Sequence, residues 1–363
     1  MQFYHTIVVY ILLPLILLSL SACDLSAPLP EEKSVTGNNA NHHTIQLTLA
    51  VAPQIAWMPW YLANEENLFH KMTAKDKIQV KFLSENYIDA IEKFITAEVH
   101  AIAISNIDAI AQIVRRDIKA DVILITNNHV GNEAILLPQA TESAAQSLKG
   151  KTFALIQQSL VPQYLLDRYL IRHQIPFDQV KIFNTTAIDL ANILINKKAD
   201  GVVANNPRLY GLTNSADAKA KILFDSRQIP KEIFDFIVVR REVLVEYPEF
   251  AQVLLASWFS VMKRLQGTKK NSTLDAIARL AQIPRQAFEK QLASLPFNDT
   301  PSKGLAAIRD RSRLKKSMRH LRYFIERHDM TGNHPVSEWV SYPGRTPALL
   351  HFNAQPLQNL LGP

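Results

Sequence analysis

The sequence has little cysteine and little glycine, and each shortage argues against a class of functional site. Cys23 is the only cysteine among 363 residues, so these residues cannot form an intrachain disulfide or a cysteine-based metal cluster. Ten glycines are few for this length, and neither G-x-G-x-x-G nor G-x-x-x-x-G-K-[ST] occurs. The glycine-built phosphate sites of dinucleotide-binding and P-loop proteins are therefore not expected.

The rest of the composition is typical of a globular protein. Apolar residues make up 47% of the sequence and charged residues 20%, values that fit neither a disordered chain nor a polytopic membrane protein. A chain of 363 residues can hold one large domain or two of ordinary size.

The net charge is +7, and much of the excess is concentrated in one basic cluster: Arg309, Arg311, Arg313, Lys315, Lys316, Arg319 and Arg322. Such a cluster indicates either a phosphate-binding or membrane-facing stripe or, more commonly, a solvated helix face. Aromatic residues are not interleaved with it, as a binder of single-stranded nucleic acid would need, so no nucleic-acid partner is predicted.

The N-terminal segment has the pattern of a lipoprotein signal peptide. An apolar run of residues 6–20 is too short for a comfortable membrane span, and Leu-Ser-Ala-Cys after it matches the bacterial lipobox. We predict a signal peptide over residues 1–22, lipidation of Cys23 and a flexible tether over residues 23–44, although MQFYH has no Lys or Arg and a buried thiol is the alternative. The body would then lie outside the cytoplasm, held on the membrane by its lipid.

From residue 45 onward, predicted strands and helices alternate. Strands are expected at 45–52, 78–83, 101–104, 121–126, 152–156, 180–183, 201–204 and 234–239, and the chain after Pro248 reads as almost wholly helical. Repeated β-α-β units imply parallel sheets covered by helices on both faces. Two such runs, joined near 127–133 and 230–236, predict two α/β lobes with two crossing segments.

Ligands of open parallel sheets bind beyond the carboxyl ends of the strands. The stretches to inspect are AWMPWY, ISNID, TNNHVGN, IQQSLVPQ, ANNPR and the strand start IFDF, which are rich in amides, hydroxyls and aromatic rings. None of these stretches places a nucleophile beside a base, so no catalytic activity is expected. No set of His, Asp and Glu residues has the spacing of metal ligands, so neither a metal nor a cofactor is expected. In AWMPWY, Trp57 and Tyr61 are predicted to face a ligand and Trp60 to lie in the core.

Four motifs in sequence order resemble the periplasmic substrate-binding proteins of ABC importers, of the nitrate/sulfonate/taurine type and its thiamine-pyrimidine-precursor-binding relatives. They are Trp57-x-Pro-x-Tyr-x-Ala with Phe69, LKGKTFALI at 148–156, ADGVVANNP at 199–207 and FDFIVVRREVLVEYPEF at 234–250. The resemblance implies a two-lobe clamshell of the type II periplasmic binding protein class, with a solute in the cleft and no chemistry performed on it. It assigns 45–127 and 236–330 to lobe 1, 128–235 to lobe 2, and leaves 331–363 as a loop-like tail that packs on lobe 1 or on a partner.

The resemblance also implies a ligand site and its character. Candidate ligand-binding residues are Trp57, Trp60, Tyr61, Ser105, Asn106, Asn127, His129, Gln157, Ser159, Asn205, Asn206 and Asp235. At Asn127, Gln157 and Asn206 this sequence has amides where relatives carry carboxylates, which favours a neutral polar or anionic solute over a cationic amine. Helix N-termini near Asn106 and Ser159 would suit an anion.

Three function classes follow. The leading one is a monomeric, lipid-anchored solute receptor that delivers its solute to the permease of an ABC transporter at the inner membrane. The second is a sensory or adaptor lipoprotein that uses the same clamshell to signal to a membrane partner. The third, an enzyme similar to thiamine-pyrimidine synthases, lacks the cysteine-rich segment that those enzymes need for iron.

Overall fold

The computed structural model describes residues 44–73, 78–138, 148–156, 159–186, 188–217, 220–332 and 335–362. The predicted signal peptide, Cys23 and all but the last residue of the predicted tether lie outside these described residues, as does Gln157. The chain from His43 to Pro363 forms one compact unit, and the description below concerns that unit alone.

The first lobe is built on a seven-stranded sheet with the strand order β11-β12-β4-β10-β3-β1-β2. Its strands are β1 (Ile45–Val51), β2 (Ile78–Ser84), β3 (Ala101–Ser105), β4 (Ala120–Asn128), β10 (Phe234–Arg240), β11 (Val340–Ser341) and β12 (Leu350–Phe352). Every residue of β3 is buried, as are all but the last of β4 and of β10, which explains their near-continuous apolar sequence.

The second lobe is built on a five-stranded sheet with the order β7-β6-β8-β5-β9. Its strands are β5 (Glu133–Pro138), β6 (Thr152–Ile156), β7 (Lys181–Thr185), β8 (Gly201–Asn205) and β9 (Ala220–Asp225). Alternate residues of these strands belong to different apolar clusters: Ile135, Leu155 and Val203 to one, and Ala134, Ile156 and Val202 to the other. Both faces of the sheet are therefore covered, one by α5 (Val161–Arg172) and the other by α6 (Leu190–Ile195) and α7 (Arg208–Asn214).

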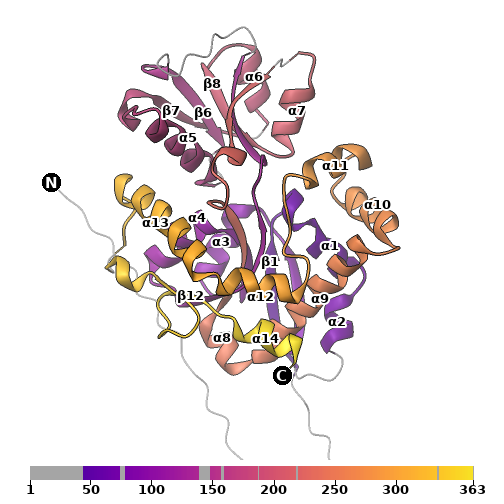
Figure 1. The fold of residues 1–363 in the computed structure, drawn as a ribbon. Coiled ribbons are helices and arrows are strands. Elements are labelled where there is room, and N and C mark those ends of the chain that lie inside the picture. Colours follow the sequence, from indigo (N-terminus) through magenta and orange to yellow (C-terminus); the bar gives the residue numbers. More distant parts are fainter. Residues whose placement is uncertain are drawn as a thin grey trace, which may run out of the picture. The chain divides into compact units, whose positions relative to one another are not determined.

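Helices surround the first sheet as well (Figure 1). They are α1 (Met58–Glu65), α2 (Leu68–Thr73), α3 (Tyr87–Ile95), α4 (Asn106–Asp108), α8 (Arg241–Glu246), α9 (Pro248–Gln266), α10 (Lys270–Leu280), α11 (Arg285–Leu292), α12 (Pro301–Arg309), α13 (Arg311–Arg327) and α14 (Gln355–Leu361). Short 3-10 or π turns occupy Ile55–Trp57 (η1), Ala109–Ile113 (η2), Val114–Arg116 (η3), Phe177–Gln179 (η5), Ser226–Gln228 (η6) and Val336–Glu338 (η7). The α/β class and the two-lobe architecture predicted from the sequence are thus confirmed.

The sheets are not wholly parallel, which corrects the prediction of parallel lobes. In the first sheet β10 runs antiparallel to both β3 and β4, and in the second β5 runs antiparallel to both β8 and β9. The reason is the double crossing between the lobes. The chain leaves the first sheet after Asn128, enters the second as β5, and returns as β10, so each crossing strand starts at the edge of its new sheet that faces the other lobe, where the neighbouring strands end.

The segment after residue 331, predicted to be loop-like, contains two strands and a helix. Strand β12 pairs in parallel with β4 and extends the first sheet, while β11 pairs with β12. Helix α14 packs on α9, where Gln252 Nε2 donates to Pro356 O at 3.0 Å, and the side chains of Phe352 and Leu357 are fully buried. Strands of two or three residues are too short to show an alternating pattern, which is why the sequence did not reveal them.

Helix α13 carries most of the basic cluster and is amphipathic. Its buried face consists of Leu314, Ser317, Met318, Leu321, Phe324 and Ile325. The basic residues occupy its other face, which is the arrangement of a packed surface helix.

Candidate functional site

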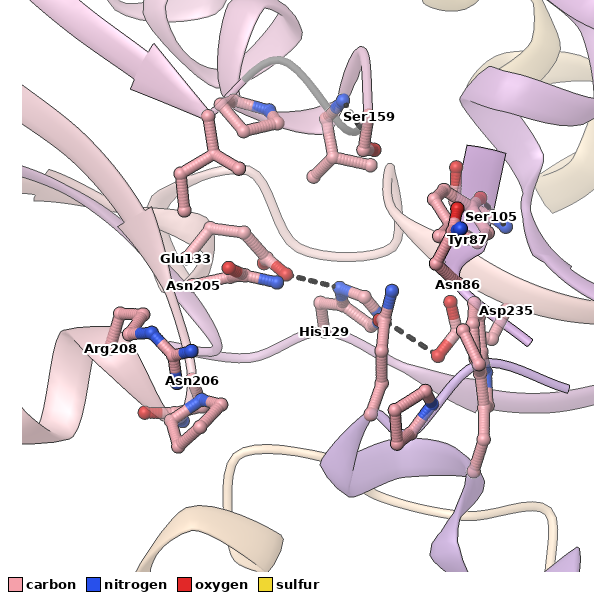
Figure 2. Close-up of a pocket in the computed structure, with 18 residues that line it drawn as sticks. Asn86, Tyr87, Ser105, His129, Glu133, Ser159, Asn205, Asn206, Arg208 and Asp235 are labelled. Atoms are coloured by element: carbon pink, nitrogen blue, oxygen red, sulfur yellow. Dashed lines mark hydrogen bonds and ion pairs between the residues drawn. The ribbon is translucent and has the colours of Figure 1, made fainter. Parts of the chain in front are cut away.

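A cavity of about 280 Å³ lies between the two sheets, at the ends of their strands (Figure 2). The first lobe lines it with residues that follow β1 and β2 and with Ser105 at the end of β3, and the second lobe with residues around the ends of β6 and β8 and with Glu133 at the start of β5. The crossing segments contribute His129 and Asp235. Both lobes thus supply walls, as the rule for open α/β sheets predicts.

His129 is the centre of a buried ionic cluster. Its Nδ1 lies 2.6 Å from Glu133 Oε1 and its Nε2 lies 3.0 Å from Asp235 Oδ2, and all three side chains are nearly inaccessible to solvent. Amide groups complete the cluster: Asn132 Nδ2 donates to Glu133 Oε1, and Asn127 Nδ2 donates to Asp235 Oδ2. Figure 2 shows His129 between the two carboxylates, with Glu133 and Asp235 on opposite sides of the ring.

The pKa of His129 is raised well above 6.5. Burial alone would lower the pKa, but attraction to Glu133 and Asp235 and the hydrogen bonds to both carboxylates outweigh the burial. His129 is therefore an imidazolium that donates both N–H groups and has no lone pair left to act as a general base.

Two oxygens of the cluster have no hydrogen-bond donor among the described residues. Glu133 Oε2 is buried and has no partner among the described residues, although Glu133 lines the cavity. Asn127 Oδ1 and Trp57 Nε1 are also buried without a partner. A buried carboxylate oxygen without a donor is costly, so it marks a position where a solute N–H or a water is expected.

Asp108, at the end of α4, lies behind the cavity wall and joins the two lobes. Its Oδ2 accepts hydrogen bonds from Tyr87 Oη (2.9 Å), Ser105 Oγ (2.8 Å) and Ser159 Oγ (2.6 Å), and its Oδ1 accepts one from Leu160 N (2.9 Å). Tyr87 and Ser105 belong to the first lobe, whereas Ser159 and Leu160 precede α5 in the second.

Burial shifts the pKa of both Asp108 and Tyr87. It raises the pKa of Asp108 above its usual value, and the hydrogen bonds from Ser159, Leu160, Ser105 and Tyr87 oppose that rise. Burial, followed by the negative charge of Asp108, also raises the pKa of Tyr87 well above 10, so the Tyr87 hydroxyl keeps its hydrogen and donates it.

The predicted anion sites at two helix N-termini are already occupied by the protein itself. The backbone N–H of Asp108 in α4 donates to Ser105 Oγ, so Ser105 is both an N-cap and a cavity residue. At α5, Leu160 N donates to Asp108 and Val161 N to Ser159 Oγ. An anion that approached these termini would meet a carboxylate rather than free N–H groups.

The aromatic residues of AWMPWY divide differently from the prediction. Trp57 lines the cavity, but it is only 1% exposed and packs against Tyr87 with a ring-centroid distance of 5.4 Å, so it serves the core as well. Trp60 lies in the core between Phe69 and Trp258. Tyr61 is not among the residues that line the cavity; its hydroxyl donates to Val51 O and contacts Ser84 Oγ.

The other predicted residues fall into two groups. Ser105, His129, Ser159, Asn205, Asn206 and Asp235 line the cavity. Asn106 and Asn127 do not: Asn106 Nδ2 donates to Glu232 O and its Oδ1 accepts from Phe234 N, which fixes a crossing segment, while Asn127 supports Asp235 from behind.

Several residues of the site were not named as candidates from the sequence, although Asp108 and Arg208 lie in the selected stretches ISNID and ANNPR. These residues are Gln54, Asn86, Tyr87, Asp108, Glu133 and Arg208. Asn86 and Tyr87 follow β2, so the strand-end rule applied to that strand would have found them. Glu133 begins a strand that was not predicted. Asp108 does not line the cavity at all, and no sequence pattern shows that it reaches Ser159, 51 positions away.

Several polar side chains of the site are engaged in hydrogen bonds within the protein. Ser105 and Ser159 donate to a carboxylate and have no neutral base beside them, and His129 is held as a cation. Within the described part of the chain, no group of three or more His, Cys, Asp or Glu side chains is placed to hold a metal ion. In the same residues, no helix has both the length and the apolar character of a membrane span.

Comparison with known proteins identifies the family. Residues 54–256, more than half of the chain, match the sequence profile described as NMT1/THI5 like. No curated protein sequence matches the chain.

Several solved structures share the fold. The periplasmic aliphatic sulphonate binding protein SsuA from Escherichia coli superposes with a TM-score of 0.65 at 14% identity, over 79% of this chain and 94% of that chain. A periplasmic sulfonate-binding protein SsuA from Methylobacillus flagellatus KT superposes with a TM-score of 0.63 at 15% identity, over 88% of this chain and 96% of that chain. The periplasmic nitrate-binding protein NrtA from Synechocystis PCC 6803 superposes with a TM-score of 0.51 at 10% identity, over 67% of this chain and 69% of that chain. The chain therefore belongs to the NMT1/THI5-like family and has the fold of the periplasmic substrate-binding proteins of ABC importers.

Proposed function

We propose that this protein is an extracytoplasmic solute receptor of an ABC importer. It captures a small, neutral polar solute, planar molecules included, in the cavity between its lobes and delivers that solute unchanged to a permease. The observation that carries the proposal is the cavity itself, since its walls come from both lobes and its polar groups suit hydrogen bonding rather than catalysis.

Charge balance supports a neutral solute. The charged residues that line the cavity are Glu133, Asp235, Arg208 and the His129 imidazolium, so two negative charges are balanced by two positive ones. The amides Asn205 and Asn206 add groups that both donate and accept hydrogen bonds. The lining charges thus sum to zero, which favours a neutral solute because burying an uncompensated charge is costly.

Attachment through a lipid on Cys23 belongs to the same proposal. The lipobox pattern supports it, and residues 23–44 would let the body reach a permease at the periplasmic face of the membrane. Replacing Cys23 with Ser should move the protein from the membrane fraction to the soluble periplasmic fraction. Retention of the Cys23→Ser protein in the membrane fraction would contradict lipid anchoring.

Thermal unfolding of the full chain in mild detergent, followed by tryptophan fluorescence, tests solute binding. The compounds to screen are sulfonates, nitrate, pyrimidines and other small heterocycles. A solute at a hundredfold its dissociation constant adds about 2.7 kcal/mol to the free energy of unfolding, which is readily measured. A well-folded, solute-free protein that no compound stabilises would instead favour the adaptor function.

A further inference from the structure

The hydroxyl groups of Tyr87, Ser105 and Ser159 share one partner, and this restricts what they can offer a solute. All three residues line the cavity, and all three hydroxyls donate to the same oxygen, Oδ2 of Asp108. A hydroxyl has a single hydrogen to donate, and a carboxylate can only accept. Each hydroxyl hydrogen is therefore used inside the protein.

Backbone N–H groups fix the same hydroxyls from the other side. Ser105 N donates to Tyr87 Oη at 3.0 Å, the N–H of Asp108 donates to Ser105 Oγ at 3.1 Å, and Val161 N donates to Ser159 Oγ at 3.1 Å. Each hydroxyl thus donates one hydrogen bond and accepts one, and it cannot rotate without breaking a buried hydrogen bond. What remains for a solute on this wall is an oxygen lone pair.

We propose that Asp108 is a positioning residue that sets the selectivity of the cavity: it turns the wall formed by Tyr87, Ser105 and Ser159 into a hydrogen-bond acceptor, so the solute presents an N–H edge to it. This inference rests on the proposed function as a solute receptor. The buried, unpartnered Glu133 Oε2 is a further acceptor in the same cavity.

The opposite side of the cavity has the complementary character. Figure 2 places Arg208 and Asn206 across the cavity from Tyr87 and Ser105. Arg208 can only donate. The favoured solute is thus an amide or aminated heterocycle with N–H groups on one edge and acceptors on the other. Oxyanions such as sulfonates and nitrate have no hydrogen to donate and would meet lone pairs on this wall, beside the negative charge of Asp108.

The test compares N–H compounds with oxyanions in the full chain, purified in detergent, by thermal shift and titration. The N–H probes are nicotinamide, cytosine and adenine, and the oxyanion probes are nicotinate, benzenesulfonate and nitrate. The wild type should bind at least one N–H probe about tenfold or more tightly than any oxyanion, the effect expected for one or two hydrogen bonds.

Asp108→Asn is the decisive variant. A carboxamide has one N–H₂ group in place of an accepting oxygen, so a wall hydroxyl must turn its hydrogen toward the cavity. The preference for N–H probes over oxyanions should then fall about tenfold or reverse, through a gain in oxyanion affinity that loss of structure could not produce. Tyr87→Phe, which keeps the ring beside Trp57, should lower the affinity for N–H probes without raising the affinity for oxyanions. This variant tests the inference if Asp108→Asn does not fold.

Asp167→Asn is the matched control. Asp167 is likewise a buried carboxylate that joins α5 to the first lobe, with Oδ1 3.2 Å from His328 Nε2, but it does not line the cavity or touch its hydroxyls. This variant should keep the wild-type preference. Tighter binding of an oxyanion than of every N–H probe by the wild type, or an unchanged preference in Asp108→Asn, would overturn the inference while leaving solute binding intact. Failure of all six probes to bind the wild type would count against the proposed function and the inference together.

Discussion

At the scale of single residues, charge pairing decides which side chains of the site tolerate substitution. The imidazolium of His129 is the only cation within hydrogen-bond distance of Glu133 and Asp235 among the described residues. Buried carboxylates are tolerated only when they are paired and hydrogen-bonded. The cluster therefore couples the folding of the two crossing segments to the formation of the cavity.

Replacing His129 with Gln should destabilise the protein strongly. The change leaves Glu133 and Asp235 buried without a counter-charge, and breaking a buried pair in this way costs about 3–5 kcal/mol. Urea denaturation at neutral pH measures the loss. His320→Gln is the control, because His320 is partly exposed and lies 3.9 Å from its nearest acidic partner, Glu232. Equal stability of His129→Gln and wild type would contradict the ionic cluster.

The raised pKa of His129 predicts how stability depends on pH. The folded state holds the imidazole proton more tightly than the unfolded chain does, so the contribution of His129 is fully present below the unfolded pKa of about 6.5. It is lost as the pH rises from there through the raised folded pKa. Imidazole NMR should show both ring nitrogens of His129 protonated at pH 7.5, and titration near pH 6.5 would refute the assignment.

Trp57 and Trp60 should differ in binding but not in stability. Both side chains are almost completely buried, so replacement of either with Ala should cost about 3–5 kcal/mol. Only Trp57 lines the cavity, so Trp57→Phe, which preserves most of the packing, should weaken solute binding, whereas Trp60→Phe should not. Paired urea denaturation and calorimetric titration separate the two effects. Equal binding by both Phe variants would place Trp57 in the core alone.

The strand-end rule identified part of the site from the sequence, and its failures have physical reasons. It selected His129, which follows β4 in the first sheet, and Ser159, which follows β6 in the second, while Asp235 was selected as part of a strand start. It could not decide between neighbours such as Trp57 and Tyr61, since the direction of a side chain in the first turn of a helix depends on tertiary packing. Asp108 was not predicted as a site residue because it holds other residues in place rather than lining the cavity.

At the scale of elements, the sequence predicted the strands that alternate with helices, the short ones included. Strands β1, β4 and β10 have runs of buried apolar residues that show in the sequence. Strands β5 and β9 were missed because they lie next to the crossing segments, where no β-α-β pattern frames them. The antiparallel direction of β5 and β10 was invisible too, since periodicity reports which residues are buried but not which way a strand runs.

The C-terminal segment should prove structural rather than a docking tail. Phe352 is fully buried against Phe236 and Tyr342, so Phe352→Ala should cost about 3–5 kcal/mol of unfolding free energy. Leu361→Ala, at a position 44% exposed in α14, is the matched control and should change stability by about 0.5 kcal/mol or less. A stable Phe352→Ala protein that fails only in transport would instead support a partner-binding role.

At the scale of the whole unit from His43 to Pro363, α5 fastens the second lobe to the first. Asp108 holds the start of α5, Glu232 accepts from Tyr164 and Arg168 in its middle, and Asp167 pairs with His328 of the first lobe. All of these contacts are made between groups of the protein itself. The lobes are therefore joined along one helix. The cavity can open only if these contacts break, or if the second lobe rotates about α5 while the contacts stay in place.

Interlobe distances should accordingly change little when solute is removed. Spin labels at Lys198 and Lys290, exposed positions in the second and first lobes, report this distance in a background with Cys23 replaced by Ser. The ligand-free protein should show one main distance, and Glu232→Gln with Asp167→Asn should broaden the distribution toward longer values. A wild-type protein that is widely open without solute would contradict the fastening role of α5.

The seven-stranded sheet has a consequence for how the protein is made. Strand β1, at the start of the described chain, lies between β3 and the edge strand β2, while β12, close to the end of the described chain, covers β4 on the other side. A nascent chain that has not yet released residues 350–352 leaves β4 as an open edge, which is a template for unwanted pairing. Completion of the first lobe must therefore wait until residues 350–352 have left the ribosome or, for an exported chain, the translocation channel.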